Sequence, residues 1–299
     1  MSNFKKKPPN NTWLQGLHHE VISPSPSFVI SNWKIKGCDW DGPYYAECGE
    51  DGILKYIFTY IDDKHKFAVD IGAAHGYGGS NIRMLVDKYG WDTTEFESRP
   101  IRKPKWSRVH PSVKKMMASP DNICEKLLKY NTPEEFDLLS LDIDSNDWYV
   151  LKSILYGGFK PSVIILEYNP IFSFDDDVVR SYSSKYNKDG SSRYGASLSA
   201  FEKLLNKYNY TLVENCVDLD NKIYSNNAIF LNNKFIRDDD KTSTIEQLHP
   251  VAWKEPWKEN KALDTTGIAW EISTIKDLKR FLIEKNIMKE LKEEDYEVN

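Results

Sequence analysis

The first stretch with residues suited to chemistry is Lys66–Asn81, KFAVDIGAAHGYGGSN. An apolar run ends in Asp70, and glycines then crowd one turn, beginning with Gly72 and Gly76. Glycines let a backbone turn tightly and approach a ligand where a Cβ would clash. An acid directly before the turn would repel a pyrophosphate. The pattern therefore favours a ligand that has no phosphate there and carries an amine or a sulfonium.

The second such stretch is Phe136–Asp147, FDLLSLDIDSND. Its apolar run is followed by three acids and an amide: Asp142, Asp144, Asn146 and Asp147. Carboxylates at the end of a buried strand are unfavourable unless they are paired, hydrogen-bonded or bound to a metal. This density of polar groups is therefore typical of a functional site rather than of packing.

A further apolar run, SVIILEYNP, ends with Glu167 and Asn169. In open α/β sheets ligands bind at the carboxyl ends of the strands. Together with Asp142 and Asp144, these oxygen ligands could hold Mg²⁺ or the hydroxyls of a sugar.

The elements that must position these residues follow an α/β pattern. Strand 67–71, the glycine turn and a helix at 82–89 form the opening unit of a nucleotide-binding sheet. A second strand is expected to end at Glu97, which lies 27 positions after Asp70, where an acid can bind ribose hydroxyls. Glu95 is the alternative acid.

Hydrophobic periodicity and Gly/Pro punctuation divide the rest of the chain. We expect an N-terminal arm (1–44), a domain over 45–231 and a C-terminal appendage (232–299). Within these we expect an irregular insertion at 170–195, final strands at 210–213 and 227–231, and an amphipathic helix over Ser273–Lys292. That helix would pack on the body or on a second subunit, which would make the protein a homo-oligomer.

Bulk properties restrict the function classes. The 299 residues carry a formal net charge of −5, which argues against a surface dedicated to nucleic acid despite basic residues at 99–118. The four cysteines are scattered, which favours free thiols in a reducing compartment. No apolar run is long enough to span a membrane and the start lacks a secretory leader. We therefore expect a cytoplasmic protein.

Several motifs together resemble those of FkbM-type methyltransferases, which are class I S-adenosylmethionine (SAM)-dependent O-methyltransferases. The motifs are DIGAAHG, SNIRML, DLLSLDIDSNDWYVLK, ILEYNP, YGASLSAFEKL and NNAIFL, in this order. They span roughly residues 45–231. The family wording is close to DIDGND, and here Ser145 replaces the glycine.

The resemblance implies a Rossmann-like, seven-stranded, mostly parallel sheet with helices on both faces and an antiparallel last strand. It also implies SAM as cofactor and a sugar or glycan-type acceptor. The methyl group would point at the edge formed by Asp142 and Asp144. The implied SAM contacts are Asp70, Gly72, Ala73, Gly76, Ser80, Asn81, Glu97, Asp142 and Ile143.

A sugar hydroxyl is a poor nucleophile, so a base or a metal should help to remove its proton. The candidate bases are Asp144 and Asp147, with Asp142 holding either SAM or a metal. His75 and His110 are secondary candidates. The candidate metal ligands are Asp142, Glu167 and Asn169, with Mg²⁺ as the ion.

Three alternatives remain at this point. One is a metal-dependent glycosyltransferase that uses Asp142 and Asp144, which leaves the glycine turn without a role. Another is a non-catalytic assembly subunit with a methyltransferase fold. A third, an RNA methyltransferase, is supported only by the basic segment at 99–118.

Overall fold

The structure is a computed structural model that describes residues 45–46, 50–61, 65–99, 109–170, 172–184, 195–217, 226–236 and 275–297. Expectations for the N-terminal arm, for the basic residues between 100 and 108, for residues 171 and 185–194 of the insertion and for 237–274 lie outside these ranges.

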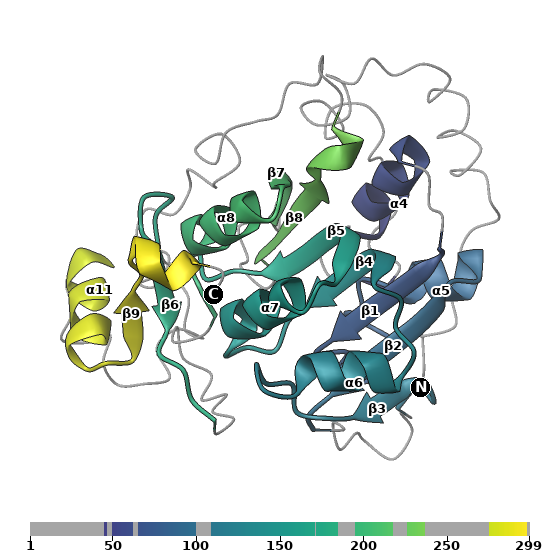
Figure 1. Ribbon diagram of the computed structural model, residues 1–299, viewed down its shortest axis with the longest axis horizontal. Coiled ribbons are helices and arrows are strands. Elements are labelled where there is room, and N and C mark those ends of the chain that lie inside the picture. Colours follow the sequence, from purple (N-terminus) through teal and green to yellow (C-terminus); the bar gives the residue numbers. More distant parts are fainter. Residues whose placement is uncertain are drawn as a thin grey trace, which may run out of the picture.

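Seven strands form one mixed sheet in the order β3-β2-β1-β4-β5-β8-β7 (Figure 1). Neighbouring strands from β3 to β5 are parallel, and β8 runs antiparallel to both β5 and β7. This confirms the predicted seven-stranded, mostly parallel α/β sheet. The strands are β1 (Phe67–Ile71), β2 (Asp92–Glu97), β3 (Val113–Lys115), β4 (Glu135–Leu141), β5 (Lys160–Glu167), β7 (Tyr210–Val217) and β8 (Asn226–Asn232).

Helices cover both faces of the sheet, because its central strands are apolar on both sides. On one face α6 (Ile123–Lys129), α7 (Asp147–Tyr156) and α8 (Leu198–Lys207) pack on side chains such as Val69 and Leu139. On the other face α4 (Glu50–Tyr60) and α5 (Arg83–Tyr89) pack with the alternate side chains, which include Ala68 and Leu138.

The predicted insertion contains a strand that the sequence did not reveal. Strand β6 (Val178–Arg180) pairs antiparallel with β9 (Met288–Glu290) near the C-terminus, and the two form a second small sheet beside the first (Figure 1). Phe172 and Val178 pack there against Leu282 and Met288. The expectation of an irregular segment was therefore wrong at 178–180.

The predicted helix over Ser273–Lys292 was also wrong in its extent. Helix α11 (Ile275–Glu284) ends early because Asn286 adopts a left-handed φ of 54°. Ile287 N then donates to Leu282 O (2.9 Å) and Asn286 N to Ile283 O (2.8 Å), which is a Schellman termination. The chain continues into β9 and a short 3₁₀ helix, Glu293–Tyr296.

The described part of the appendage packs on the body of the same chain. Lys152 Nζ donates to Asp295 O (2.5 Å), and the Tyr296 ring lies 5.8 Å from the Trp148 ring. Lys207 pairs with Glu293 at 2.6 Å. No helix within the described ranges has the length and apolarity needed to cross a bilayer.

Strand β1 lies between β2 and β4. From β1 the strand order runs outward in one direction through β2 and β3 and in the other through β4 and β5, and α/β sheets open a ligand-binding crevice at such a switch point. Gly72, just after β1, has φ 102° and donates its N–H to Phe96 O at the end of β2 (2.9 Å). An added Cβ at Gly72 would lie 1.5 Å from Asp142 O, at the end of β4. The turns after β1 and β4 therefore touch through their backbones.

This contact predicts that position 72 tolerates only glycine. Gly72→Ala should lower the free energy of unfolding by about 4 kcal/mol or more, since the backbone of Asp142 cannot yield as a flexible side chain would. Gly158 is the matched control, because its φ is 89° but nothing lies within 4 Å of an added Cβ. Gly158→Ala should lose only about 1–2 kcal/mol from backbone strain. Urea unfolding of both variants measures the difference, and equal losses would contradict the close approach.

Candidate functional site

A cavity of about 630 Å³ opens at the carboxyl edge of β1, β2 and β4. Its volume is within the range of small-molecule sites, about 300–1,000 Å³. The lining residues fall within five segments, 71–79, 96–99, 116–121, 142–146 and 182–184. The glycine turn and the acid-rich turn after β4, predicted as the two functional stretches, thus share one cavity.

The predicted cofactor residues divide into two groups. Gly72, Glu97, Asp142 and Ile143 line the cavity. The others lie behind its wall or support it: Asp70, Ala73, Gly76, Ser80 and Asn81. Ala73 is buried and donates its N–H to Phe96 O (3.0 Å), while an added Cβ at Gly76 would meet His110 and Val113.

Glu97 ends β2 at the cavity, as the sequence predicted. Its Oε2 accepts the N–H of Ala74 in the glycine turn (3.0 Å). Its Oε1 accepts from Arg99 N (2.8 Å) and Ser98 Oγ (3.1 Å). These bonds fix the carboxylate against the turn, and a carboxylate can accept further hydrogen bonds from hydroxyl groups.

Asp70 is buried beneath the turn rather than in the cavity wall. Ser80 Oγ donates to Asp70 Oδ2 (3.2 Å), and Asn81 Nδ2 donates to Ser140 Oγ on β4 (3.3 Å). Burial raises the pKa of Asp70 from 3.8 to about 7, and the charge of Glu95 adds to the rise. Hydrogen bonds with Ser140 and Ser80 oppose it.

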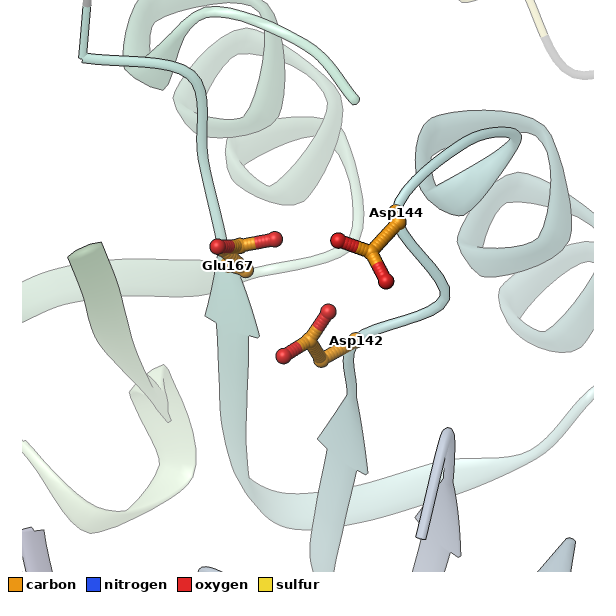
Figure 2. Close-up of side chains that lie close together, drawn as sticks. All are labelled: Asp142, Asp144 and Glu167. Atoms are coloured by element: carbon orange, nitrogen blue, oxygen red, sulfur yellow. The ribbon is translucent and has the colours of Figure 1, made fainter. Parts of the chain in front are cut away.

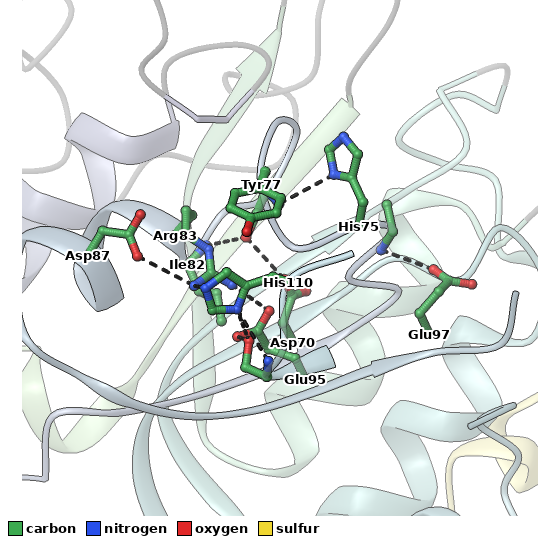
Figure 3. A network of polar contacts seen from close by, with 12 residues as sticks. Asp70, His75, Tyr77, Ile82, Arg83, Asp87, Glu95, Glu97 and His110 are labelled. Atoms are coloured by element: carbon green, nitrogen blue, oxygen red, sulfur yellow. Dashed lines mark hydrogen bonds and ion pairs between the residues drawn. The ribbon is translucent and has the colours of Figure 1, made fainter. Parts of the chain in front are cut away.

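Glu95, the alternative to Glu97, belongs to a buried network (Figure 3). Its Oε2 lies 2.6 Å from Nη2 of Arg83, and both side chains are fully buried. Ser112 Oγ donates to Glu95 Oε1 (2.5 Å) and therefore accepts from His110 Nδ1. Because a guanidinium only donates, His110 Nε2 accepts from Arg83 Nη1 (3.4 Å). Glu95 is thus engaged away from the cavity.

The same network supports the glycine turn from outside. His110 N donates to His75 O (2.9 Å), and the His110 ring packs edge-on against Tyr77, with centroids 5.1 Å apart. Neither His75 nor His110, the secondary base candidates, lines the cavity. Their contacts are those of residues that hold the turn.

Asp147 closes the acid-rich turn. Its Oδ1 accepts from Ile143 N (2.7 Å) and its Oδ2 from Ser145 N (2.8 Å). Burial raises its pKa from 3.8 to about 6, and these two backbone bonds oppose the rise. Asp144 has a left-handed φ of 57° and lines the cavity, whereas Asp147 does not. Of the two candidate bases, Asp144 is therefore the one placed to reach a ligand.

Asp142, Asp144 and Glu167 point toward one another from the ends of β4 and β5 (Figure 2). One carboxylate oxygen from each lies within 4.8 Å of the others, so the three could hold a cation. Burial raises the pKa of Glu167 well above its ordinary value, and the charges of Asp142 and Asp144 raise it further. Asn169, the third predicted metal ligand, is fully buried with its N–H donating to Ala196 O (2.7 Å).

Sequence patterns missed several of these groups. Arg83 lies among the apolar residues at the start of its helix, Ile82 and Met84–Val86, and a cation at that position was the available signal for a buried acid partner. Met116 and Met117, after the edge strand β3, line the cavity without any motif. The segment Tyr182–Ser184 also lines it, from within the predicted insertion.

Comparison of the chain with models of known protein families and with curated proteins found no match to either.

The raised pKa of Asp70 predicts a pH dependence of stability. A carboxyl whose pKa is raised by folding favours the folded state fully below about pH 4, and this contribution is lost as pH rises through about 7. One pKa unit is about 1.4 kcal/mol, so the loss is about 4 kcal/mol. Relative to Asp70→Asn, the wild type should therefore lose about that much unfolding free energy between pH 4 and pH 8 in urea titrations. A difference that stays flat with pH would contradict this environment for Asp70.

Proposed function

We propose that this chain is a SAM-dependent O-methyltransferase, similar to the FkbM type, that acts on a hydroxyl of a sugar or glycan. The single observation that carries the proposal is that the glycine turn and the acid-rich turn line one cavity of small-molecule size. An acid-rich cavity without a phosphate-binding pattern suits a cation such as a sulfonium.

The residues of the cavity fit such a cofactor. Gly72, Gly78 and Gly79 expose backbone without side chains along one wall. Glu97 offers carboxylate oxygens for the two ribose hydroxyls. Met116, Met117 and Ile143 provide apolar surface for a flat base.

When bound, SAM supplies an electrophilic methyl group on a sulfonium sulfur, which becomes a neutral thioether as the new C–O bond forms. The chain has to align the acceptor hydroxyl with that methyl group and to remove its proton. Asp144 is the proposed base, since it lines the cavity whereas Asp147 does not. Asp144 takes the hydroxyl proton, so the acceptor oxygen keeps the electron pair that forms the bond.

Asp142, Asp144 and Glu167 would also hold Mg²⁺, because three carboxylates this close repel one another unless a proton or a cation intervenes. The same cluster is what favours the second candidate function, a metal-dependent glycosyltransferase. That alternative gives no role to the glycines at 72–79 that line the cavity.

The base assignment predicts separate effects on binding and on turnover. Asp144→Asn keeps the size of the side chain but removes the base, so methyl transfer should fall by about 10²–10⁴-fold while the SAM affinity stays within about twofold. Asp92→Asn, an exposed residue at the opposite edge of the sheet, is the control and should change neither. The measurements are calorimetry with SAM, with S-adenosylhomocysteine (SAH) and with UDP-sugars, and label transfer from methyl-labelled SAM to cell glycans. Binding of UDP-sugars without SAM would favour the glycosyltransferase, and loss of SAM binding in Asp144→Asn would refute the assigned role.

The carboxylate cluster predicts cation binding. Calorimetric titration with Mg²⁺ should give a dissociation constant near or below about 10⁻³ M, and Glu167→Gln should weaken it at least tenfold. Glu135→Gln changes a half-exposed acid at the other end of β4 and should leave binding unchanged. If the wild type binds no Mg²⁺ up to about 10 mM, the cluster is not a metal site.

A further inference from the structure

The segments that line the cavity are arranged in the same order as the strands that they follow. Segments 116–121, 96–99 and 71–79 follow β3, β2 and β1, which are neighbours, and segment 142–146 follows β4. The proposed cofactor contacts occupy the ends of β1 and β2. The remaining wall, Tyr182–Ser184, is attached at the end of β4 beside the proposed base.

We propose that Tyr182–Ser184 is the wall of the cavity that binds the acceptor, with Tyr182 as a stacking surface for a sugar ring and Asn146 as the residue that positions it. This inference rests on the proposed methyltransferase function, which assigns the other end of the cavity to the cofactor.

Asn146 joins this wall to the acid-rich turn. Its side chain is buried, and both of its polar atoms bond to the backbone of one residue. Nδ2 donates to Ser183 O (2.6 Å), and Ser183 N donates to Oδ1 (3.3 Å). Only an amide side chain offers a donor and an acceptor in this arrangement, so the position of the wall depends on Asn146.

A second attachment fixes the same wall from the other side. Strand β6 leads directly into it, and Ser181 N donates to Ile287 O (2.9 Å), which continues the pairing of β6 with β9. Val178 of β6 is buried against Leu282 and Met288. The C-terminal segment therefore braces the wall, which gives this part of the appendage a role at the site.

Tyr182 has the surface that a sugar requires. The residue is 44% exposed although it lines the cavity, and its ring packs edge-on against Tyr149 with centroids 5.4 Å apart. A sugar presents an apolar C–H face and a rim of hydroxyls. An exposed aromatic face with Asp144 and Ser184 nearby in the same lining complements both features.

The test is ligand-observed saturation-transfer NMR on the full-length protein, with and without SAH. The probes are methyl glycosides of glucose, galactose, mannose, rhamnose and xylose. We expect at least one glycoside to bind, Tyr182→Ala to weaken it about tenfold, and Tyr182→Trp to restore it. SAH affinity by calorimetry should stay within twofold throughout.

The matched control is Tyr156→Ala. Tyr156 ends α7, is 60% exposed and does not line the cavity, so its removal should leave glycoside binding unchanged. Asn146→Ala should weaken glycoside binding as Tyr182→Ala does, and Asn146→Gln, which keeps the amide, should restore part of it.

Two outcomes would overturn the inference. One is a glycoside that binds Tyr182→Ala as tightly as it binds Tyr156→Ala, and the other is the absence of saturable binding by any of the five glycosides. Failure of SAH to bind the wild type would instead overturn the proposed function. The experiments without SAH would still decide whether Tyr182–Ser184 binds sugars.

Discussion

The site depends on one contact between two backbones. Gly72, after β1, lies so close to the carbonyl of Asp142, after β4, that no side chain fits between them. Asp142 N also donates to Ile71 O (2.9 Å), so the parallel pairing of the two strands extends to their last residues. Because the two turns leave the sheet in contact, the groups that they carry face the same cavity. A ligand that spans them meets glycine backbone on one side and carboxylates on the other.

Several carboxyl groups near the site are buried, and burial favours their protonated form. Asp70, Asp147 and Glu167 all have raised pKa values, and burial is the first cause in each case. A buried, charged carboxylate is unfavourable for folding, and carboxyl groups with strongly perturbed pKa values cluster at functional sites. The chain offsets part of the penalty with serine hydroxyls at Asp70, with backbone N–H groups at Asp147 and with the buried Arg83 beside Glu95.

The sequence predicted the parts of this architecture that depend on local pattern. Apolar runs followed by glycines or acids placed β1, β4 and β5 and the two turns, because burial on both faces leaves a continuous apolar signal. The methyltransferase assignment itself stays a prediction.

Long-range partners could not be predicted in the same way. The pairing of β6 with β9 joins residues more than 100 positions apart, and three-residue strands leave no periodicity to detect. Helix α11 ended early because one asparagine adopted a left-handed conformation within a charged, helix-like pattern. Which of Asp144 and Asp147 faces the cavity also depended on backbone hydrogen bonds that spacing alone does not reveal.

The acid-rich turn assigns different tasks to neighbouring side chains. Asp147 holds the turn by accepting two backbone N–H groups, which leaves Asp142 and Asp144 to face the cavity and Glu167. Asn146, between Asp144 and Asp147 in sequence, also lines the cavity and holds Ser183 through two hydrogen bonds. Loss of Asp147 should therefore disturb the carboxylates and the Tyr182–Ser184 wall together, although Asp147 itself touches neither the cavity nor Ser183. The site at this edge of the sheet therefore depends on Asp147, a buried acid that holds the turn without lining the cavity.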